Sequence, residues 1–273
     1  MIISYLYWDP KPFIFPWKLP LLDRPILWYG LFFALGISLA YVAFVSLLRH
    51  EKAHEVKTNA RKITDQISTY LLVGILLGAR LFDIIFYENW HQFLKDPLFI
   101  FRFWEGGLSS HGAVIGMIVA ILVYQKRHSY FKTLHLLDLL SIVAVVAAGC
   151  IRIGNFFNQE ILGKPSHVPW AIVFGHPADG TFPVPRHPVQ LYEAIFYLAV
   201  FGMMWRLRRR LHSWPQGRLC GLFLILVFTF RWIIEFFKEE QSVWIGTSIL
   251  TMGQWLSIPL VILGLILYYR TRS

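Results

Sequence analysis

Three arginines lie inside stretches that otherwise have the composition of membrane-spanning helices. They are Arg80, Arg152 and Arg231, each flanked by runs of apolar residues. Placing a guanidinium in hydrocarbon costs about 3 kcal/mol on insertion scales. A chain bears this cost three times only if the charges face partner side chains, water or an anionic ligand. We therefore expect the protein to hold a negatively charged group within the bilayer.

The partners available to these arginines differ. Arg80 has Asp83 at i+3 and Arg231 has Glu235 at i+4, so each carboxylate either neutralises its arginine as a structural ion pair or helps to build a site. Arg152 has no carboxylate three or four residues away. Its partner must come from elsewhere, and a phosphate is the natural candidate because its oxygens match the guanidinium fork.

A histidine among glycines is a candidate general base. His111 lies in EGGLSSHGAVIG, where glycines allow close backbone approach at the start of a helix. On spacing alone, a packed or interfacial histidine is the commoner explanation. A histidine that titrates near neutral pH can instead accept a proton in catalysis, and neighbouring cationic groups favour that role.

Composition indicates an integral membrane protein. Of the 273 residues, 56% are hydrophobic and only 15% are charged, whereas a soluble domain has roughly 25% charged residues. In such a protein the net charge of +10 is more typical of cytoplasmic loops that rest against anionic lipid than of nucleic-acid binding. We expect membrane lipids, and no nucleic acid, among the partners.

The two cysteines show no catalytic pattern. Cys150 and Cys220 lie in or beside apolar segments, with neither CxxC spacing nor a histidine nearby in the sequence. This favours small core residues over a nucleophile or a disulfide. We expect neither a metal site nor a cofactor.

Hydropathy predicts seven membrane-spanning helices. The apolar stretches run over 26–48, 70–87, 111–124, 134–156, 189–205, 219–237 and 249–269. The third and fifth are short for a crossing of about 20 residues, but their neighbours extend them. Fifteen of the 26 Lys and Arg residues fall in the loops 49–64, 125–133 and 206–218 and in the C-terminal tail. The positive-inside rule therefore places the N-terminus outside and the C-terminus in the cytoplasm.

The expected fold is all-α, a single transmembrane domain over residues 1–273. Within it, the segment 157–188 is rich in proline and predicts a small periplasmic head or a mobile flap. The apolar stretch 97–107 is too short to cross the membrane and is interrupted by Arg102, so we expect an interfacial or re-entrant element there.

The polar residues of the predicted helices lie at similar depths in the membrane. With a helix rise of about 1.5 Å per residue, the three arginines fall about 15–27 Å above the cytoplasmic ends of their helices. Tyr29 and His111 lie near the outer starts of theirs. The outer half of the membrane therefore collects polar groups from five helices, while the inner half has little comparable apart from Asp138.

Six segments carry a combined pattern of specific residues. They are WYG (28–30), GGLSSHGAVIG (106–116), RIGNFFNQEILG (152–163), PRHPVQLYEA (185–194), FRWIIEFFKE (230–239) and MGQWLSIP (252–259). Together, in this order and over most of the chain, they resemble the prolipoprotein diacylglyceryl transferases of bacteria.

The resemblance implies a reaction between a lipid and a protein. In this family a diacylglyceryl group moves from phosphatidylglycerol to the thiol of a lipobox cysteine in a pre-lipoprotein, a thioether forms and glycerol phosphate leaves. It also implies a multi-pass enzyme of the bacterial inner (cytoplasmic) membrane. The acceptor cysteine belongs to the substrate, which agrees with a core role for Cys150 and Cys220.

The resemblance assigns roles to individual residues. The catalytic set that it implies is His111 as base, Arg152 and Arg231 on the phosphate, and Tyr29 as a headgroup or thiol contact. The substrate-binding set is Arg80, Gly106, Gly112, Arg152, Asn155, Glu160, Gly163, Arg231 and Glu235, in which the glycines set backbone turns and Glu235 positions Arg231. An arginine-rich field can also lower the pKa of the thiol by itself, so both explanations of His111 stay open.

Two positions depart from the family pattern. Many members carry a tyrosine four residues before the arginine that matches Arg231, where this chain has Val227. Lys238 stands where many relatives have arginine, which keeps the charge but loses the fork.

Two other functions fit the charges on physical grounds. A transporter or channel for an anionic solute or lipid also uses intramembrane arginines. It would place polar groups at both depths and often carry an internal repeat, and the sequence shows neither. A scaffold that binds anionic lipid would explain the charges but not the block of histidine and glycines.

Replacing His111 by Asn tests its role as base. If His111 takes the thiol proton, the rate of the chemical step falls, by about 10²–10⁴-fold for a lost general base. Single-turnover measurement separates this step from substrate binding. An unchanged rate would remove His111 from the catalytic set.

Overall fold

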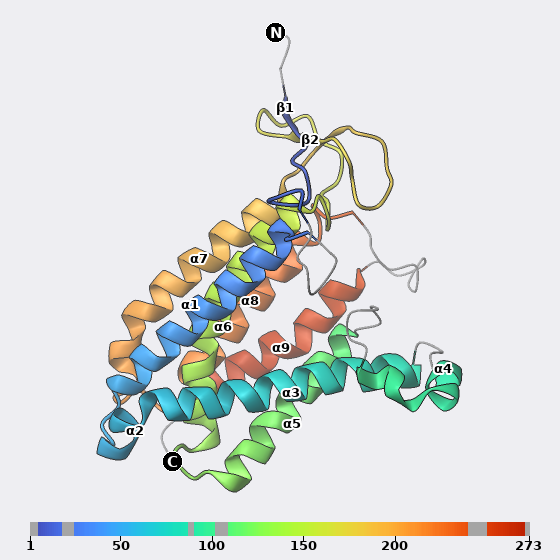
Figure 1. The fold of residues 1–273 in the computed structure, drawn as a ribbon. Coiled ribbons are helices and arrows are strands. Elements are labelled where there is room, and N and C mark those ends of the chain that lie inside the picture. Colours follow the sequence, from blue (N-terminus) through green and yellow to red (C-terminus); the bar gives the residue numbers. More distant parts are fainter. Residues whose placement is uncertain (1–4, 18–24, 87–89, 102–108, 240–249, 271–273) are drawn as a thin grey trace. The chain divides into compact units, whose positions relative to one another are not determined.

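The computed structural model describes residues 5–17, 25–86, 90–101, 109–239 and 250–270. The described chain is mostly helical. Its elements are β1 (Leu6–Trp8), α1 (Trp28–Arg49), α2 (His54–Thr58), α3 (Ala60–Phe86), α4 (Trp90–Lys95), the 3-10 helix η1 (Pro97–Phe101), α5 (Ser110–Arg127), α6 (Thr133–Phe157), β2 (Ile172–Phe174), β3 (Pro185–Arg186), α7 (Val189–Leu207), the 3-10 helix η3 (Arg208–Arg210), α8 (Arg218–Ile234) and α9 (Met252–Tyr269) (Figure 1).

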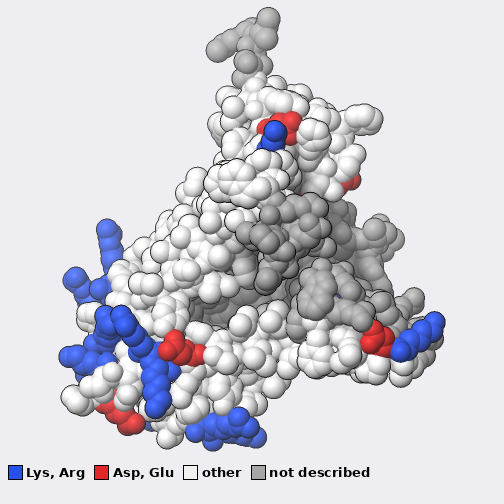
Figure 2. Space-filling view, in the orientation of Figure 1, with Lys and Arg blue, Asp and Glu red and all other residues white. Residues whose placement is uncertain are grey.

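Each of the seven apolar stretches overlaps one helix for most of its length. Four helices, α1, α3, α6 and α9, are long and apolar enough to cross a membrane on their own. On the face drawn in Figure 2, Lys and Arg gather at a few places near the margins, and most of the described surface between them carries no charged residue. The chain is therefore a membrane protein built mainly of helices.

Among the helix boundaries that differ from the expected ones, the starts of α3 and α9 carry hydrogen bonds between side chains and backbone. α3 begins at Ala60, ten residues before its apolar stretch, and Thr64 donates its hydroxyl to the carbonyl of Ala60. α9 begins after Thr251, whose hydroxyl accepts from the amide of Gln254 while the Gln254 side chain accepts from the amide of Thr251. This capping box satisfies backbone donors that the start of a helix leaves free.

The chain divides into two compact units, residues 44–136 and the remainder. In the larger unit, small residues allow close helix contacts. A Cβ at Gly36 of α1 would lie 2.9 Å from the Cβ of Cys150 on α6, and one at Gly149 of α6 would lie 3.1 Å from Leu198 on α7. α8 packs on α9 through Gly221 and Gly264 in the same way. Such contacts are the usual means of helix association within lipid.

Asp138 joins the N-terminal ends of α6 and α8. One carboxylate oxygen accepts from the amide of Gly217 across 2.7 Å, and the other accepts from the amide of Cys220 across 2.8 Å. A carboxylate at this place accepts hydrogen bonds from free amides and interacts favourably with the positive end of the helix dipole at the start of α8. Asp138 therefore serves as a helix cap. Cys150 and Cys220 are both buried and not disulfide-bonded, as core residues would be.

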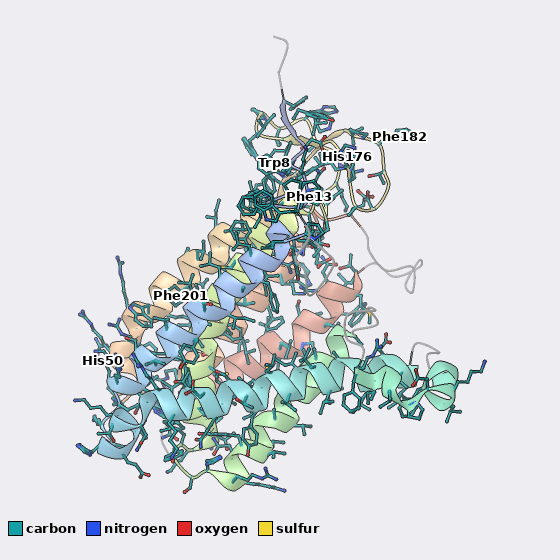
Figure 3. All side chains as sticks on the ribbon, in the orientation of Figure 1. Trp8, Phe13, His50, His176, Phe182 and Phe201 are labelled. Carbon is teal, nitrogen blue, oxygen red and sulfur yellow. The ribbon has the colours of Figure 1, made fainter. Side chains whose placement is uncertain are left out.

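A small sheet, which the all-α prediction missed, lies at the C-terminal end of α6. β2 pairs in parallel with β1 and antiparallel with β3. Trp8 stacks on Phe156 with ring centroids 4.6 Å apart and donates its indole N–H to the Phe156 carbonyl. Phe174 completes this apolar cluster. Leu162, Ile172 and Phe174 of the segment 157–188 thus share a small core with Phe156 and Trp8. Figure 3 labels Trp8 in this region, together with the exposed His176 and Phe182.

The smaller unit is organised by a glycine crossing between α3 and α5. A side chain at Gly116 would collide with the carbonyl oxygen of Gly74, and one at Gly112 would collide with the carbonyl oxygen of Gly78. The two GxxxG pairs therefore bring the helix backbones into direct contact. The turn expected at Gly112 is wrong, because this glycine lies within α5 and serves helix packing.

Replacing Gly116 by Ala tests this crossing. Since the obstacle is backbone rather than a flexible side chain, the helices must separate, and we expect a loss on the order of 1–3 kcal/mol. The melting temperature of the purified protein in detergent measures it. Gly202→Ala is the matched control, because nothing lies within 4 Å of a Cβ there. Equal melting temperatures for the two variants would contradict the close crossing.

Candidate functional site

The last turn of α6 carries two of the predicted site residues and joins them to a third. Arg152 donates from Nη1 to Oδ1 of Asn155 across 3.0 Å. Asn155 then donates from Nδ2 to Oε1 of Glu160 across 2.6 Å, and Asn158 makes a longer bond of 3.4 Å to the same oxygen. The structure therefore brings Arg152, Asn155 and Glu160 together in one hydrogen-bonded row.

Glu160 is held in place by an unusual backbone. Its two neighbours, Gln159 and Ile161, adopt positive φ angles of 53° and 56°, a conformation that is costly for a β-branched residue such as isoleucine. Gln190, fully buried on α7, compensates by donating from Nε2 to the Glu160 carbonyl across 2.8 Å. Strain of this kind is often found at functional sites.

Gln159 ties this turn to the small sheet. Its side-chain oxygen accepts from the amide of His176 across 2.8 Å, and its side-chain nitrogen donates to Asp9 across 3.2 Å. The imidazole of His176 also contacts Asp9, at 2.6 Å. Hydrogen bonds from His176 and Gln159 lower the pKa of Asp9. The positive-φ turn is thus anchored from both sides.

The partner of Arg152 is Glu193 on α7, a residue that the sequence analysis missed. Nε of Arg152 lies 3.1 Å from Oε2 of Glu193, whose side chain is fully buried. Lys238 places Nζ 3.0 Å from the other oxygen of the same carboxylate. Glu193 therefore separates two cations, which offsets much of the cost of burying them. The available signal was a single carboxylate inside an apolar span.

The ionic contacts continue to Arg231. Nζ of Lys238 lies 3.8 Å from Oε1 of Glu235, which lies 4.0 Å from Nη2 of Arg231. The five side chains, from Arg231 through Glu235, Lys238 and Glu193 to Arg152, alternate in sign and carry one more positive than negative charge. We call them the ionic row. It joins α6, α7 and the end of α8.

The surroundings of the ionic row fix two of its members. Thr251 donates its hydroxyl to Oε2 of Glu235 across 3.3 Å, and a side chain at Gly253 would collide with the same carboxylate. Burial lowers the pKa of the Lys238 ammonium, while Glu193 acts in the opposite direction. The departure at Lys238 is accommodated, since its single nitrogen reaches one oxygen of each of two carboxylates.

A cavity of about 380 Å³ opens beside Arg152. Arg152, Asn155, Tyr29 and Tyr197 form its polar part. The other lining residues are Ala144, Val145, Ala148, Ile151, Ile161, Phe223 and Val227. The cavity thus combines a cationic part with a larger apolar one.

Tyr29 and Gly163 owe their positions to close packing. A Cβ at Gly154 of α6 would lie 3.0 Å from the Tyr29 ring, so the glycine lets α1 bring this tyrosine against the start of the RIGNF motif. A side chain at Gly163 would collide with His187. The Gly163 carbonyl accepts from Nη1 of Arg186 across 3.1 Å.

The remaining predicted residues belong to the smaller unit. Arg80 and Asp83 are both buried on α3, with exposed fractions of 1% and 6%. His111 lies in the first turn of α5, where its side chain is outside the described structure, and Gly106 is outside the described residues. The ionic row and its cavity therefore belong wholly to the larger unit.

Comparisons with known proteins agree with one another. Residues 16–270 match the family model described as prolipoprotein diacylglyceryl transferase. The chain is 38% identical to the phosphatidylglycerol–prolipoprotein diacylglyceryl transferase of Tolumonas auensis, over 96% of each chain. It is 37% identical to the protein of the same name from Chloroherpeton thalassium, over 98% of this chain and 95% of the relative. It is 31% identical to the protein of the same name from Protochlamydia amoebophila, over 99% of this chain and 96% of the relative.

Replacing Glu193 by Gln tests the ionic row. It leaves Arg152 and Lys238 close together without their shared anion, and breaking a buried pair in this way costs about 3–5 kcal/mol. We expect a clear fall in melting temperature. Glu55→Gln is the control, because this carboxylate is exposed on α2, and surface substitutions usually change stability by less than about 0.5 kcal/mol. Similar effects of the two substitutions would contradict a buried, shared carboxylate.

Proposed function

The chain belongs to the prolipoprotein diacylglyceryl transferase family, and we propose that it transfers a diacylglyceryl group from phosphatidylglycerol to the lipobox cysteine of pre-lipoproteins. The enzyme is a transferase of lipoprotein biosynthesis, in agreement with the names of its relatives. These names leave the alternative of a transporter or channel without support. The observation that carries the proposal is Arg152 at the polar part of a largely apolar cavity.

The reaction joins sulfur to carbon and releases a phosphate ester. The cysteine thiolate attacks the glyceryl carbon that bears the phosphate, a C–S bond forms, and the C–O bond to phosphate breaks. The bonding electrons leave with the oxygen, so the phosphodiester becomes the monoester glycerol phosphate and gains negative charge. Guanidinium groups that face the phosphate therefore stabilise the transition state more than the ground state.

We assign the phosphate to Arg152 and Arg231. In Arg152, Nε faces Glu193 and Nη1 faces Asn155, which orients the plane of the guanidinium at the cavity wall. The side chain of Arg231 is 34% exposed, and its guanidinium has further N–H donors besides the nitrogen that lies 4.0 Å from Glu235. The extra positive charge of the ionic row favours a bound anion.

We assign supporting roles to the neighbouring residues. Asn155 and Glu160 shape the headgroup site, and Tyr29 contacts the headgroup or the thiol from the wall formed by α1. The thiol of a free cysteine has a pKa of about 8.5, so it needs a base or a cationic field. We further propose His111 as that base, and roles in substrate binding for Arg80, Gly106, Gly112 and Gly163.

We propose the topology that the sequence predicts. Seven helices cross the inner membrane of a bacterium, with the N-terminus outside and the C-terminus in the cytoplasm. The segment 157–188 forms a periplasmic head of a single transmembrane domain. The exposed apolar sides of the helices and the basic residues at their ends support this arrangement (Figure 2).

Replacing Arg152 by Ala and by Lys tests the assignment. Removing a group that stabilises developing charge costs about 10²–10³-fold in kcat, and Lys should recover only part because it lacks the fork. Purified protein is incubated with phosphatidylglycerol and a lipobox peptide, and mass spectrometry measures the gain of one diacylglyceryl unit on cysteine. Arg208→Ala, whose guanidinium lies over the Trp205 ring, is the control.

The two possible failures of this assay are distinct. No mass gain with the unaltered protein would contradict the proposed function. Near-normal turnover by Arg152→Ala would leave the function intact and remove Arg152 from the phosphate site.

A further inference from the structure

Tyr197 contacts the ionic row from within α7. It lies one turn after Glu193 and is only 4% exposed. Its hydroxyl donates to Oε1 of Glu193 across 3.5 Å, the same oxygen that accepts from Lys238 at 3.0 Å. The other oxygen, Oε2, faces Arg152. The hydroxyl and the ammonium therefore hold one side of the carboxylate and leave the other side for the arginine.

The ring of Tyr197 is fixed by aromatic contacts between α7 and α8. Phe196 stacks on Phe230 with centroids 3.8 Å apart, and Tyr197 meets the same ring in an edge-to-face contact at 6.4 Å. With the ring held, the hydroxyl has little freedom to leave Glu193. A buried phenol usually finds a polar partner, and here that partner belongs to the site.

Tyr197 also lines the cavity beside Arg152. On the α8 wall of the same cavity stands Val227, one turn before Arg231, and its side chain offers no hydrogen bond. Among the described lining residues, the hydroxyl groups come from Tyr29 on α1 and Tyr197 on α7. Only the second is hydrogen-bonded to Glu193, so the two phenols occupy different positions in the site.

We propose that Tyr197 is a positioning residue for the transfer reaction. It orients Glu193 and, through it, the guanidinium of Arg152 toward the cavity, and it supplies from α7 a hydroxyl that the α8 wall lacks at Val227. This proposal rests on the proposed function, because it deepens the role of the same site.

Tyr197→Phe removes the hydroxyl and keeps the ring. A hydrogen bond to a charged group typically corresponds to about a tenfold effect or more, so we expect kcat to fall about tenfold with KM within about twofold. The melting temperature should stay close to that of the unaltered protein. Tyr124→Phe is the matched control: Tyr124 is a buried tyrosine on α5 whose hydroxyl has no hydrogen-bond partner in the described part of the chain. Its activity should not change.

The double variant Tyr197→Phe with Val227→Tyr distinguishes a role in the site from simple packing. Returning a phenol to the cavity from α8 should recover part of the lost kcat. Normal turnover by Tyr197→Phe, a fall in melting temperature in place of the loss in kcat, or a double variant no better than the single one would overturn the proposal. Inactivity of the unaltered protein would instead contradict the proposed function.

Discussion

The cost of burying charge governs the architecture of this protein. Glu193 lies fully buried between Arg152 and Lys238, at 3.1 and 3.0 Å. Separate charges in a medium of low polarity would each cost several kcal/mol, whereas an alternating row offsets much of that cost. Glu235 and Arg231 extend the row toward α8. The alternation of sign stabilises the row, and under the proposed function its excess of one cation favours a negative ligand.

The backbone next to the ionic row holds Glu160 in position. Glu160 stands between two residues with positive φ, and Gln159 and Gln190 hold that turn through hydrogen bonds to the sheet and from α7. The small sheet therefore has a role beyond closing a loop. It holds the turn after α6, and with it the carboxylate that orients Asn155.

The lining of the cavity changes from apolar to polar along α6. Small side chains of α6, Ala144 and Ala148, line its apolar part, while Arg152 and Asn155 of the same helix line its polar part. One helix therefore presents a change from apolar to cationic character along a single face. Under the proposed function, this order corresponds to the order of groups in a phospholipid, from acyl chain to headgroup.

Most of the fold could be predicted from hydropathy, since each apolar stretch is long enough to show its period and its length. The sheet could not, because β1 and β2 are three residues long and pair across more than 160 positions of the chain. Neither strand has a pattern that stands out from the loops around it. The early start of α3 was also missed, because polar residues such as Thr64 hide a helical turn from hydropathy.

For the site, the sequence by itself determined that the chain lies in a membrane, that Arg152 needs a partner from elsewhere, and which family pattern its residues follow. Only the tertiary structure decided that the partner is Glu193 and that Lys238 and Tyr197 share that carboxylate. The physical reason is that a sequence pattern relates residues close together in the chain, whereas these contacts join different helices. Spacing along a helix relates residues three or four positions apart, whereas contacts between α6, α7 and the end of α8 depend on how the helices pack and rotate against one another.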